Sequence, residues 1–145
     1  MAVRVDQAEL CLPLLLGRVH AEILRRYTAA ARSADCPIEE WWVLSSLATR
    51  GGRPMSEIAE YAGMPNPSLT KVVDRMVAAN LVFRRVDPED RRRTLLYLTT
   101  RGQEKHTEVA VAVADAEAEM RAAAGEDPVG TLHAVLAGLA PALLP

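Results

Sequence analysis

Two short runs of β-favouring residues interrupt a chain that is otherwise patterned for helices. Residues 81–86 (LVFRRV) and 94–98 (TLLYL) are rich in branched and aromatic side chains, and an Asp-Pro step lies in the segment between them. Such runs on either side of a turn sequence predict a β-hairpin. Four helical segments precede the hairpin and two follow it, so the pattern predicts a mainly α-helical fold with one small hairpin.

Proline, glycine and apolar spacing mark the first three helices. Apolar residues recur at helical spacing over residues 12–31, with Pro13 in the first turn, where proline is tolerated. A second helix is expected to begin at Pro37 and to stop at the glycine pair 51–52. A third, short helix is expected to end at Gly63.

Two further helices are expected after the hairpin. Thr99 or Thr100 is expected to cap a long, alanine-rich helix, and Gln103 stands where Thr100 would need a capping-box partner. This helix is expected to run to about residue 124. Residues 125–128 then break it, and a last apolar helix follows.

Length and composition fit a single domain. The chain has 145 residues, of which 50% are hydrophobic and only 4% aromatic, a composition that favours helices. Cys11 and Cys36 are too few for a disulfide framework, and no stretch is long enough to span a bilayer. The apolar run at 10–17 is short, acidic residues (Asp6 and Glu9) precede it and Arg18 closes it, so we do not expect a signal peptide. We therefore expect a cytoplasmic protein that does not bind membranes.

Charge is distributed unevenly along the chain. The formal net charge is −2, yet residues 71–105 contain nine Lys or Arg against five Asp or Glu. Five arginines stand within the ten residues RRVDPEDRRR, at 84–93, together with Asp87, Glu89 and Asp90. A basic middle between acidic ends is the electrostatic pattern of a nucleic-acid-binding segment, although the total charge alone argues against one.

The third and fourth helices have the pattern of a helix-turn-helix. Gly63 supplies the turn residue, and the fourth helix is expected to have Asn66 as its cap and Pro67 as its first helical residue. Ile58, Ala59, Leu69 and Val72 supply the apolar contacts between the two helices. The residues left on the outer face of the fourth helix are polar and reach base edges and phosphates in a major groove; they are Ser68, Thr70, Lys71, Asp74 and Arg75.

A helix-turn-helix followed directly by an arginine-rich hairpin is a winged helix, and this one resembles the MarR family of transcriptional regulators. The resemblance rests on Asp90 and Arg92 at the wing tip and on Leu98, Thr99 and Gly102 at the start of the next helix. It covers nearly the whole chain, but the alanine- and leucine-rich ends carry no distinctive matches.

The resemblance implies how the domain is organised. Residues 37–99 would form the DNA-binding winged helix, and residues 1–36 and 100–145 would form helices through which two chains dimerise. The partner would be a palindromic operator, bound by a homodimer acting as a repressor. Residues expected to contact DNA are Pro67, Ser68, Thr70, Lys71, Asp74, Arg75, Arg84, Asp90, Arg91 and Arg92.

The resemblance also implies a role for the acid at the wing tip. Arg92 would enter a minor groove, and the carboxylate of Asp90 would hold its guanidinium in place. A paired arginine loses less conformational entropy when it binds, and narrow minor grooves attract arginine strongly. Asp87 and Glu89 are interpreted as turn residues. The alternative is that Asp90 is one more turn acid.

Members of the family release DNA when a small, often phenolic, effector binds between the two parts. Residues His20, Tyr27, Trp41 and Trp42 are candidates for its lining, although adjacent tryptophans on a helix are more often core residues. No cofactor is expected.

Cys11 lies where the peroxide-sensing OhrR branch of the family has its reactive cysteine, and a helix N-terminus stabilises a thiolate. The tyrosine partners of that branch are missing, because Leu15 occupies the next turn. A thiol-sensing regulator is one alternative. A second alternative is a winged helix that binds proteins and no DNA. We do not expect an enzyme, because the three histidines are scattered and no metal-ligand spacing is present.

Overall fold

The computed structural model describes residues 10–125 and 127–144. In this part of the chain the elements are α1 (Leu12–Ser33), α2 (Ile38–Thr49), β1 (Arg53–Pro54), α3 (Met55–Ala62), α4 (Asn66–Ala78), β2 (Val82–Val86), β3 (Thr94–Leu98), α5 (Thr100–Ala124) and α6 (Pro128–Leu143). The predicted class, mainly α-helical with a small hairpin, is confirmed. No helix within these residues is long and apolar enough to cross a membrane.

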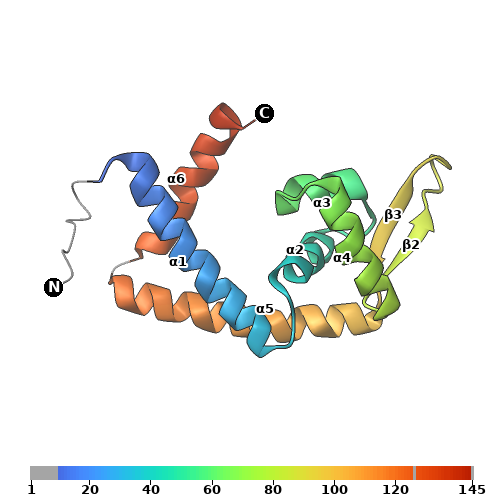
Figure 1. Ribbon diagram of the computed structural model, residues 1–145, viewed down its shortest axis with the longest axis horizontal. Coiled ribbons are helices and arrows are strands. Elements are labelled where there is room, and N and C mark those ends of the chain that lie inside the picture. The colour runs from blue at the N-terminus through green and yellow to red at the C-terminus, as the bar shows by residue number, and fades with distance from the viewer. Residues whose placement is uncertain (1–9, 126, 145) are drawn as a thin grey trace.

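The long helix α5 joins two parts of the molecule (Figure 1). At its N-terminal end, α2, α3, α4 and the sheet form what we call the winged-helix lobe. Helix α1 crosses α5 near its middle and α6 folds back from its other end, and we call α1 and α6 the arms. Figure 1 shows the arms and the lobe rising from the same side of α5 with open space between them.

The first turn of α4 differs from the prediction. Pro65, not Asn66, is the N-cap, and its extended backbone (φ −61°, ψ 141°) places its carbonyl to accept from Ser68 and Leu69. Asn66 is already helical, and its side chain caps nothing. The predicted Asn66 cap is therefore wrong, because the fixed φ of Pro65 begins the helix one residue earlier. In the same way Pro37 is the N-cap of α2 rather than its first helical residue.

The turn between α3 and α4 is the one that the glycine predicts. Gly63 ends α3 in the left-handed region with φ 60°, a conformation that glycine adopts without a steric penalty. The N–H of Met64 donates to the carbonyl of Ala59 at 3.0 Å, which satisfies an otherwise unpaired helix-end acceptor. The helix-turn-helix prediction is confirmed here.

The hairpin is confirmed, but it belongs to a three-stranded antiparallel sheet in the order β1-β3-β2. Strand β2 pairs with β3 in a register that sets Val82 opposite Leu98 and Arg84 opposite Leu96. Strand β1 was not predicted. It has only two residues, one of them proline, and its pairing with β3 depends on a contact distant in sequence.

Thr99 caps α5 and fixes it to the turn before β2. Its hydroxyl accepts from the N–H of Gly102 at 2.9 Å and donates to the carbonyl of Asn80 at 2.7 Å. The backbone N–H of Thr99 donates to the carbonyl of Leu81 at 3.0 Å. Of the two predicted caps, Thr99 is confirmed, so the capping box of Thr100 with Gln103 does not form.

One hydrophobic core runs through the lobe and into the flanking helices. Leu44 of α2, Leu69 of α4 and Leu96 of β3 are buried, and so are Ala31 of α1 and Val109 of α5, all in the same cluster. Because α1 and α5 share this core with the lobe, both helices are packed against it.

Candidate nucleic-acid interface

Helix α4 buries one face and presents the other to solvent. Leu69, Val72, Val73 and Met76 are buried in the core. Every residue predicted to contact DNA from this helix is exposed, namely Pro67, Ser68, Thr70, Lys71, Asp74 and Arg75. Thr70 donates its hydroxyl to the carbonyl of Asn66 at 2.9 Å, which orients that side chain along the helix. The outer face of α4 is therefore polar and open to a groove of DNA.

Two ion pairs connect α4 to two different neighbouring elements. Asp74 Oδ1 accepts from Arg84 Nη2 of β2 at 2.7 Å. Arg75 Nε lies 3.7 Å from Glu40 Oε1 of α2. Burial raises the pKa of Glu40, and the guanidinium of Arg75 opposes that shift. Asp74, Arg75 and Arg84 thus have partners within the protein.

The wing, which we define as β2, β3 and the loop 87–93, is shaped by its acids through the backbone. Asp87 Oδ1 accepts from the N–H of Glu89 at 2.9 Å. Asp90 Oδ1 accepts from the N–H of Arg92 at 3.0 Å, and the Asp90 carbonyl accepts from the N–H of Arg93 at 2.9 Å. Each carboxylate accepts a hydrogen bond from the backbone N–H two residues later, which is the geometry of an Asx-turn.

The predicted pairing of the Asp90 carboxylate with the Arg92 guanidinium is not formed in this structure. Among the described residues, no ion pair involves Asp90. The physical reason is local, because the turn brings the N–H of Arg92 to the carboxylate while the side chain extends into solvent. The alternative interpretation of Asp90, as a turn acid, describes the free chain correctly.

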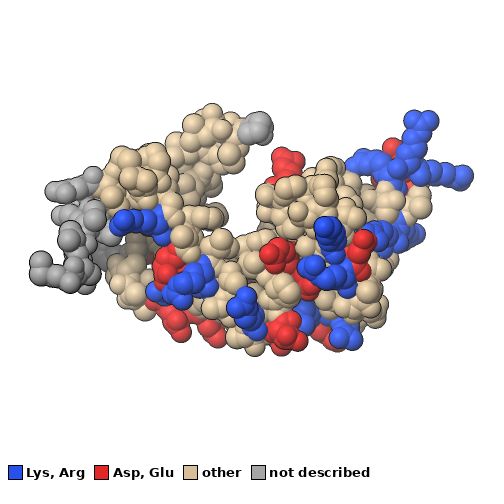
Figure 2. Space-filling view, viewed as in Figure 1, with Lys and Arg blue, Asp and Glu red and all other residues tan. Residues whose placement is uncertain are grey.

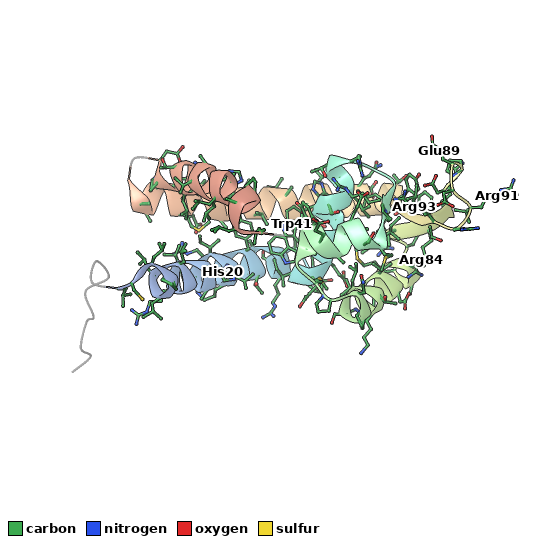
Figure 3. All side chains as sticks on the ribbon, turned by 90° about the horizontal axis from the view of Figure 1, so that it is seen from above. His20, Trp41, Arg84, Glu89, Arg91 and Arg93 are labelled. Carbon is green, nitrogen blue, oxygen red and sulfur yellow. The ribbon has the colours of Figure 1, made fainter. Side chains whose placement is uncertain are left out.

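The wing tip carries a dense group of exposed arginines. Arg91, Arg92 and Arg93 are exposed, and none of them takes part in an ion pair within the described residues. Lys and Arg atoms gather at the far end of the wing in Figure 2, and Figure 3 shows Arg91 pointing away from the molecule at the tip. Guanidinium groups without internal partners are available to phosphates and minor-groove edges.

Some residues of this surface were not predicted. Arg85 and Arg93 are exposed beside the predicted contacts, and the arginine run itself was the signal that they share its function. Phe83 stacks on Tyr97 across the two strands, with ring centroids 5.4 Å apart, and stiffens the outer face of the hairpin. The pairing of Glu40 with Arg75 could not be predicted from the sequence, because it depends on the packing of α2 against α4.

The four predicted effector residues do not line one cavity. Tyr27 and Trp42 lie against each other with ring centroids 6.1 Å apart, and Trp41 is buried and stacks on His106 at 5.2 Å. His20 is exposed on α1, well separated from Trp41 (Figure 3). Neighbouring residues on a helix point in different directions, so the four side chains are spread over the single chain, and an effector site that they share stays a prediction.

Several hollows lie elsewhere on the described surface, among them two beside α5. A groove of about 450 Å³ between α1 and α5 is lined in part by Arg25, Arg26, Asp115 and Glu119. A cleft of about 340 Å³ lies between α2, β3 and α5, with His106 in its wall. Burial lowers the pKa of His106, which favours the neutral form of the ring that stacks on Trp41.

The two cysteines lie in different environments. Cys11 is exposed and is the N-cap of α1, where its side chain makes no capping hydrogen bond. Burial raises the pKa of the Cys36 thiol to about 12. Residues 10–125 and 127–144 contain no group of three or more His, Cys, Asp or Glu side chains placed to hold a metal ion.

Comparisons with known proteins agree with this arrangement. Residues 35–93 match the model of the MarR family. The regulator FarR of Neisseria gonorrhoeae is 26% identical over 127 residues, which cover 86% of this chain and 87% of FarR. MarR of E. coli in its apo form superposes with a TM-score of 0.78 at 25% identity, covering 94% of this chain and 98% of that one.

Two ligand-bound structures have the same fold. The repressor CouR bound to a 23-mer DNA duplex has a TM-score of 0.84 at 23% identity, covering 97% of this chain and 99% of CouR. NadR in complex with 4-hydroxyphenylacetate has a TM-score of 0.77 at 24% identity, covering 97% and 98%. With its helix-turn-helix, its three-stranded sheet and its matching segment, the chain is similar to transcriptional regulators of the MarR family over nearly its whole length.

Proposed function

We propose that this protein is a repressor that binds an inverted-repeat operator as a homodimer and releases it when a small molecule binds. The observation that carries the proposal is the wing tip, where Arg91, Arg92 and Arg93 are exposed and have no ion-pair partner in the described chain, beside the open polar face of α4. In this proposal the outer face of α4 enters a major groove and Arg92 enters the neighbouring minor groove.

The homodimer is supported by the apolar surface of the arms. Leu12 is 67% exposed and Leu143 is 74% exposed, and the other large exposed apolar residues of the arms include Leu14, Val135, Leu136 and Leu139. A contiguous apolar surface on two helices is typical of a protein–protein interface. One winged helix offers few base contacts, and a second copy would double them on a symmetric operator.

The effector is proposed to be a small aromatic acid. NadR was solved with 4-hydroxyphenylacetate, which supports this chemical class for a chain of the same fold. The groove between α1 and α5 carries Arg25 and Arg26, which already bind one carboxylate, that of Glu22, and an acidic effector would take its place. Tyr27 and Trp42 supply an aromatic pair on α1 and α2. A regulator of this type acts on the chromosome, so the proposal includes a location in the cytoplasm.

Selection of genomic DNA tests the proposal. Purified protein is mixed with sheared DNA of its own source organism, bound fragments are recovered and sequenced, and a variant with Lys71→Ala and Arg92→Ala is treated in parallel. We expect wild type to enrich fragments that share one inverted repeat, and the variant to lose that enrichment. Equal, unenriched recovery by both proteins would contradict sequence-specific binding and would favour the protein-interaction alternative.

A further inference from the structure

The strand alternation of the wing directs one arginine toward α4 rather than toward solvent at the tip. Side chains of a strand alternate between its two faces, and directly paired residues of neighbouring strands share a face. Arg84 is paired with Leu96, which is buried in the core, so Arg84 lies on the core face of the hairpin, two residues beyond the buried Val82. From there it reaches Asp74 of α4, and Arg84 Nη2 donates to Asp74 Oδ1 at 2.7 Å.

Arg84 therefore differs from the arginines at the wing tip. Its guanidinium is paired inside the protein, whereas Arg91 extends from the far end of the wing, as Figure 3 shows. Asp74, the one acid on the outer face of α4, is likewise paired within the protein. An unpaired carboxylate there would repel the phosphates of bound DNA, and its pairing with Arg84 offsets that charge.

We propose that Asp74 and Arg84 are positioning residues, which set the angle between α4 and the wing so that the two enter adjacent grooves together. This inference rests on the proposed DNA binding. It assigns to both residues a role different from direct contact with bases. The neighbouring Arg75 pairs with Glu40 of α2, so consecutive residues of the recognition helix tie it to the wing and to α2.

The solvent exposure of the Asp74–Arg84 ion pair limits how much it contributes to stability and to DNA affinity. The side chains of Arg84 and Asp74 are 39% and 58% exposed, so the pair contributes little to the stability of the fold. Its effect is expected in DNA affinity, at up to about fivefold per protomer, which is the upper end for exposed ion pairs. The fold itself is expected to be unchanged in single variants.

A double-mutant cycle on DNA affinity tests the proposal. Affinity for the enriched inverted repeat is measured by fluorescence anisotropy for wild type, Asp74→Asn, Arg84→Gln and the double variant. We expect each single variant to weaken binding and the double variant to bind no more weakly than Arg84→Gln alone, because the two changes remove the same interaction. Asp74→Glu retains a carboxylate and is expected to restore most of the affinity.

Two controls make the result specific. Glu89→Gln removes one exposed acid of the wing that has no ion-pair partner among the described residues, and it is expected to bind DNA as tightly as wild type or more tightly. In hydroxyl-radical footprints, Asp74→Asn is expected to lose protection at the flanking minor grooves while protection over the repeat remains. Both single variants should melt within a few degrees of wild type.

Three results would overturn the proposal. Tighter binding by Asp74→Asn would show that its carboxylate only repels phosphate. Additive losses in the double variant would show that Arg84 contacts DNA independently of Asp74. In either case wild type still binds the repeat, so the proposed function stands and only the positioning role fails. If wild type binds no DNA, both proposals fail together.

Discussion

The carboxylate of Asp90 bonds the backbone of the wing tip. It accepts the N–H of Arg92 at 3.0 Å, while the carbonyl of the same residue accepts the N–H of Arg93 at 2.9 Å. These two bonds close the end of the loop and direct the following arginine side chains outward. A fixed turn reduces the conformational entropy that the tip loses on binding DNA, without any bond to a guanidinium.

Substitutions of Asp90 separate the turn from the charge. Asp90→Asn keeps a side-chain oxygen that accepts the N–H of Arg92 and removes one negative charge near the phosphates. We expect it to bind operator DNA as tightly as wild type or up to about tenfold more tightly. Asp90→Ala loses the turn and is expected to bind less tightly than Asp90→Asn, by about 0.5–1.5 kcal/mol, the worth of one hydrogen bond. Anisotropy titrations check this order, and equal loss in both variants would indicate a carboxylate–guanidinium pair in the complex.

Glu40 links stability to pH because burial raises its pKa. A carboxyl whose folded pKa lies above its unfolded value of about 4.5 stabilises the fold at low pH, and this stabilisation is lost as the pH rises through the raised pKa. Glu39 and Asp35 raise this pKa further, and Arg75 opposes them. As the pH rises from 4.5 to 7, we expect the free energy of unfolding to fall less in Glu40→Gln than in wild type. Urea denaturation at the two pH values measures this, and an unchanged difference would mean that Glu40 titrates normally.

At the scale of elements, the start of α5 positions the wing. The carbonyl of Leu81, at the turn before β2, accepts the N–H of Thr99, and a Cβ added to Gly102 would lie 1.9 Å from that carbonyl oxygen. Helix α5 can approach the turn only because residue 102 lacks a side chain. The Leu-Thr-x-x-Gly sequence is thus explained by packing, since Thr99 caps the helix and Gly102 allows contact.

Gly102→Ala is expected to be strongly destabilising. The backbone of Leu81 has to move to admit a methyl group, which costs about 3 kcal/mol or more. Arg101→Ala, an exposed change in the same helical turn, is the control and is expected to lie within about 0.5 kcal/mol of wild type. Urea denaturation of both variants gives the comparison. Equal stability of Gly102→Ala and the control would show that this contact is looser than the structure indicates.

The elements that could be predicted from the sequence are those whose signals are local. The hairpin follows from two β-favouring runs, the end of α3 from Gly63, and the outward face of α4 from helical spacing. The pairing of β1 with β3, the stack of Trp41 on His106 and the ion pair of Asp74 with Arg84 depend on contacts between distant segments. The turn that Asp90 makes in the free chain could not be predicted, because a carboxylate two residues from an arginine fits a side-chain pair and a turn equally well.

At the scale of the whole molecule, the arms expose the apolar surface that one chain leaves uncovered. They rise from the half of α5 remote from the wing, and Figure 2 shows α6 as an uncharged surface on the visible face, while charged atoms gather over α1. We expect a symmetric dimer through α1 and α6, in which the two winged-helix lobes stay free to bind DNA.

Charged substitutions on the arms test the dimer. Leu139→Glu places a carboxylate on the exposed apolar side of α6 and is expected to weaken dimerisation by at least tenfold, because a buried unpaired charge costs several kcal/mol. Tyr61→Glu, a change at an exposed aromatic of α3 in the winged-helix lobe, is the control and is expected to leave the dimer intact. Sedimentation velocity at micromolar concentration measures both. A wild-type monomer that binds the inverted repeat tightly would contradict the dimer.

The salt dependence of DNA binding tests the central claim most directly. The affinity of wild type for the enriched inverted repeat is measured by anisotropy between 50 and 300 mM salt. Phosphate contacts release counterions, so the logarithm of affinity falls with the logarithm of salt concentration by about 0.9 for each phosphate neutralised. A dimer that uses α4 and the arginines of both wings is expected to give a slope of about −5 or steeper, and Arg92→Ala a shallower one. A slope near zero for wild type would contradict the claim that α4 and the wing arginines bind the operator, because such binding must neutralise phosphates.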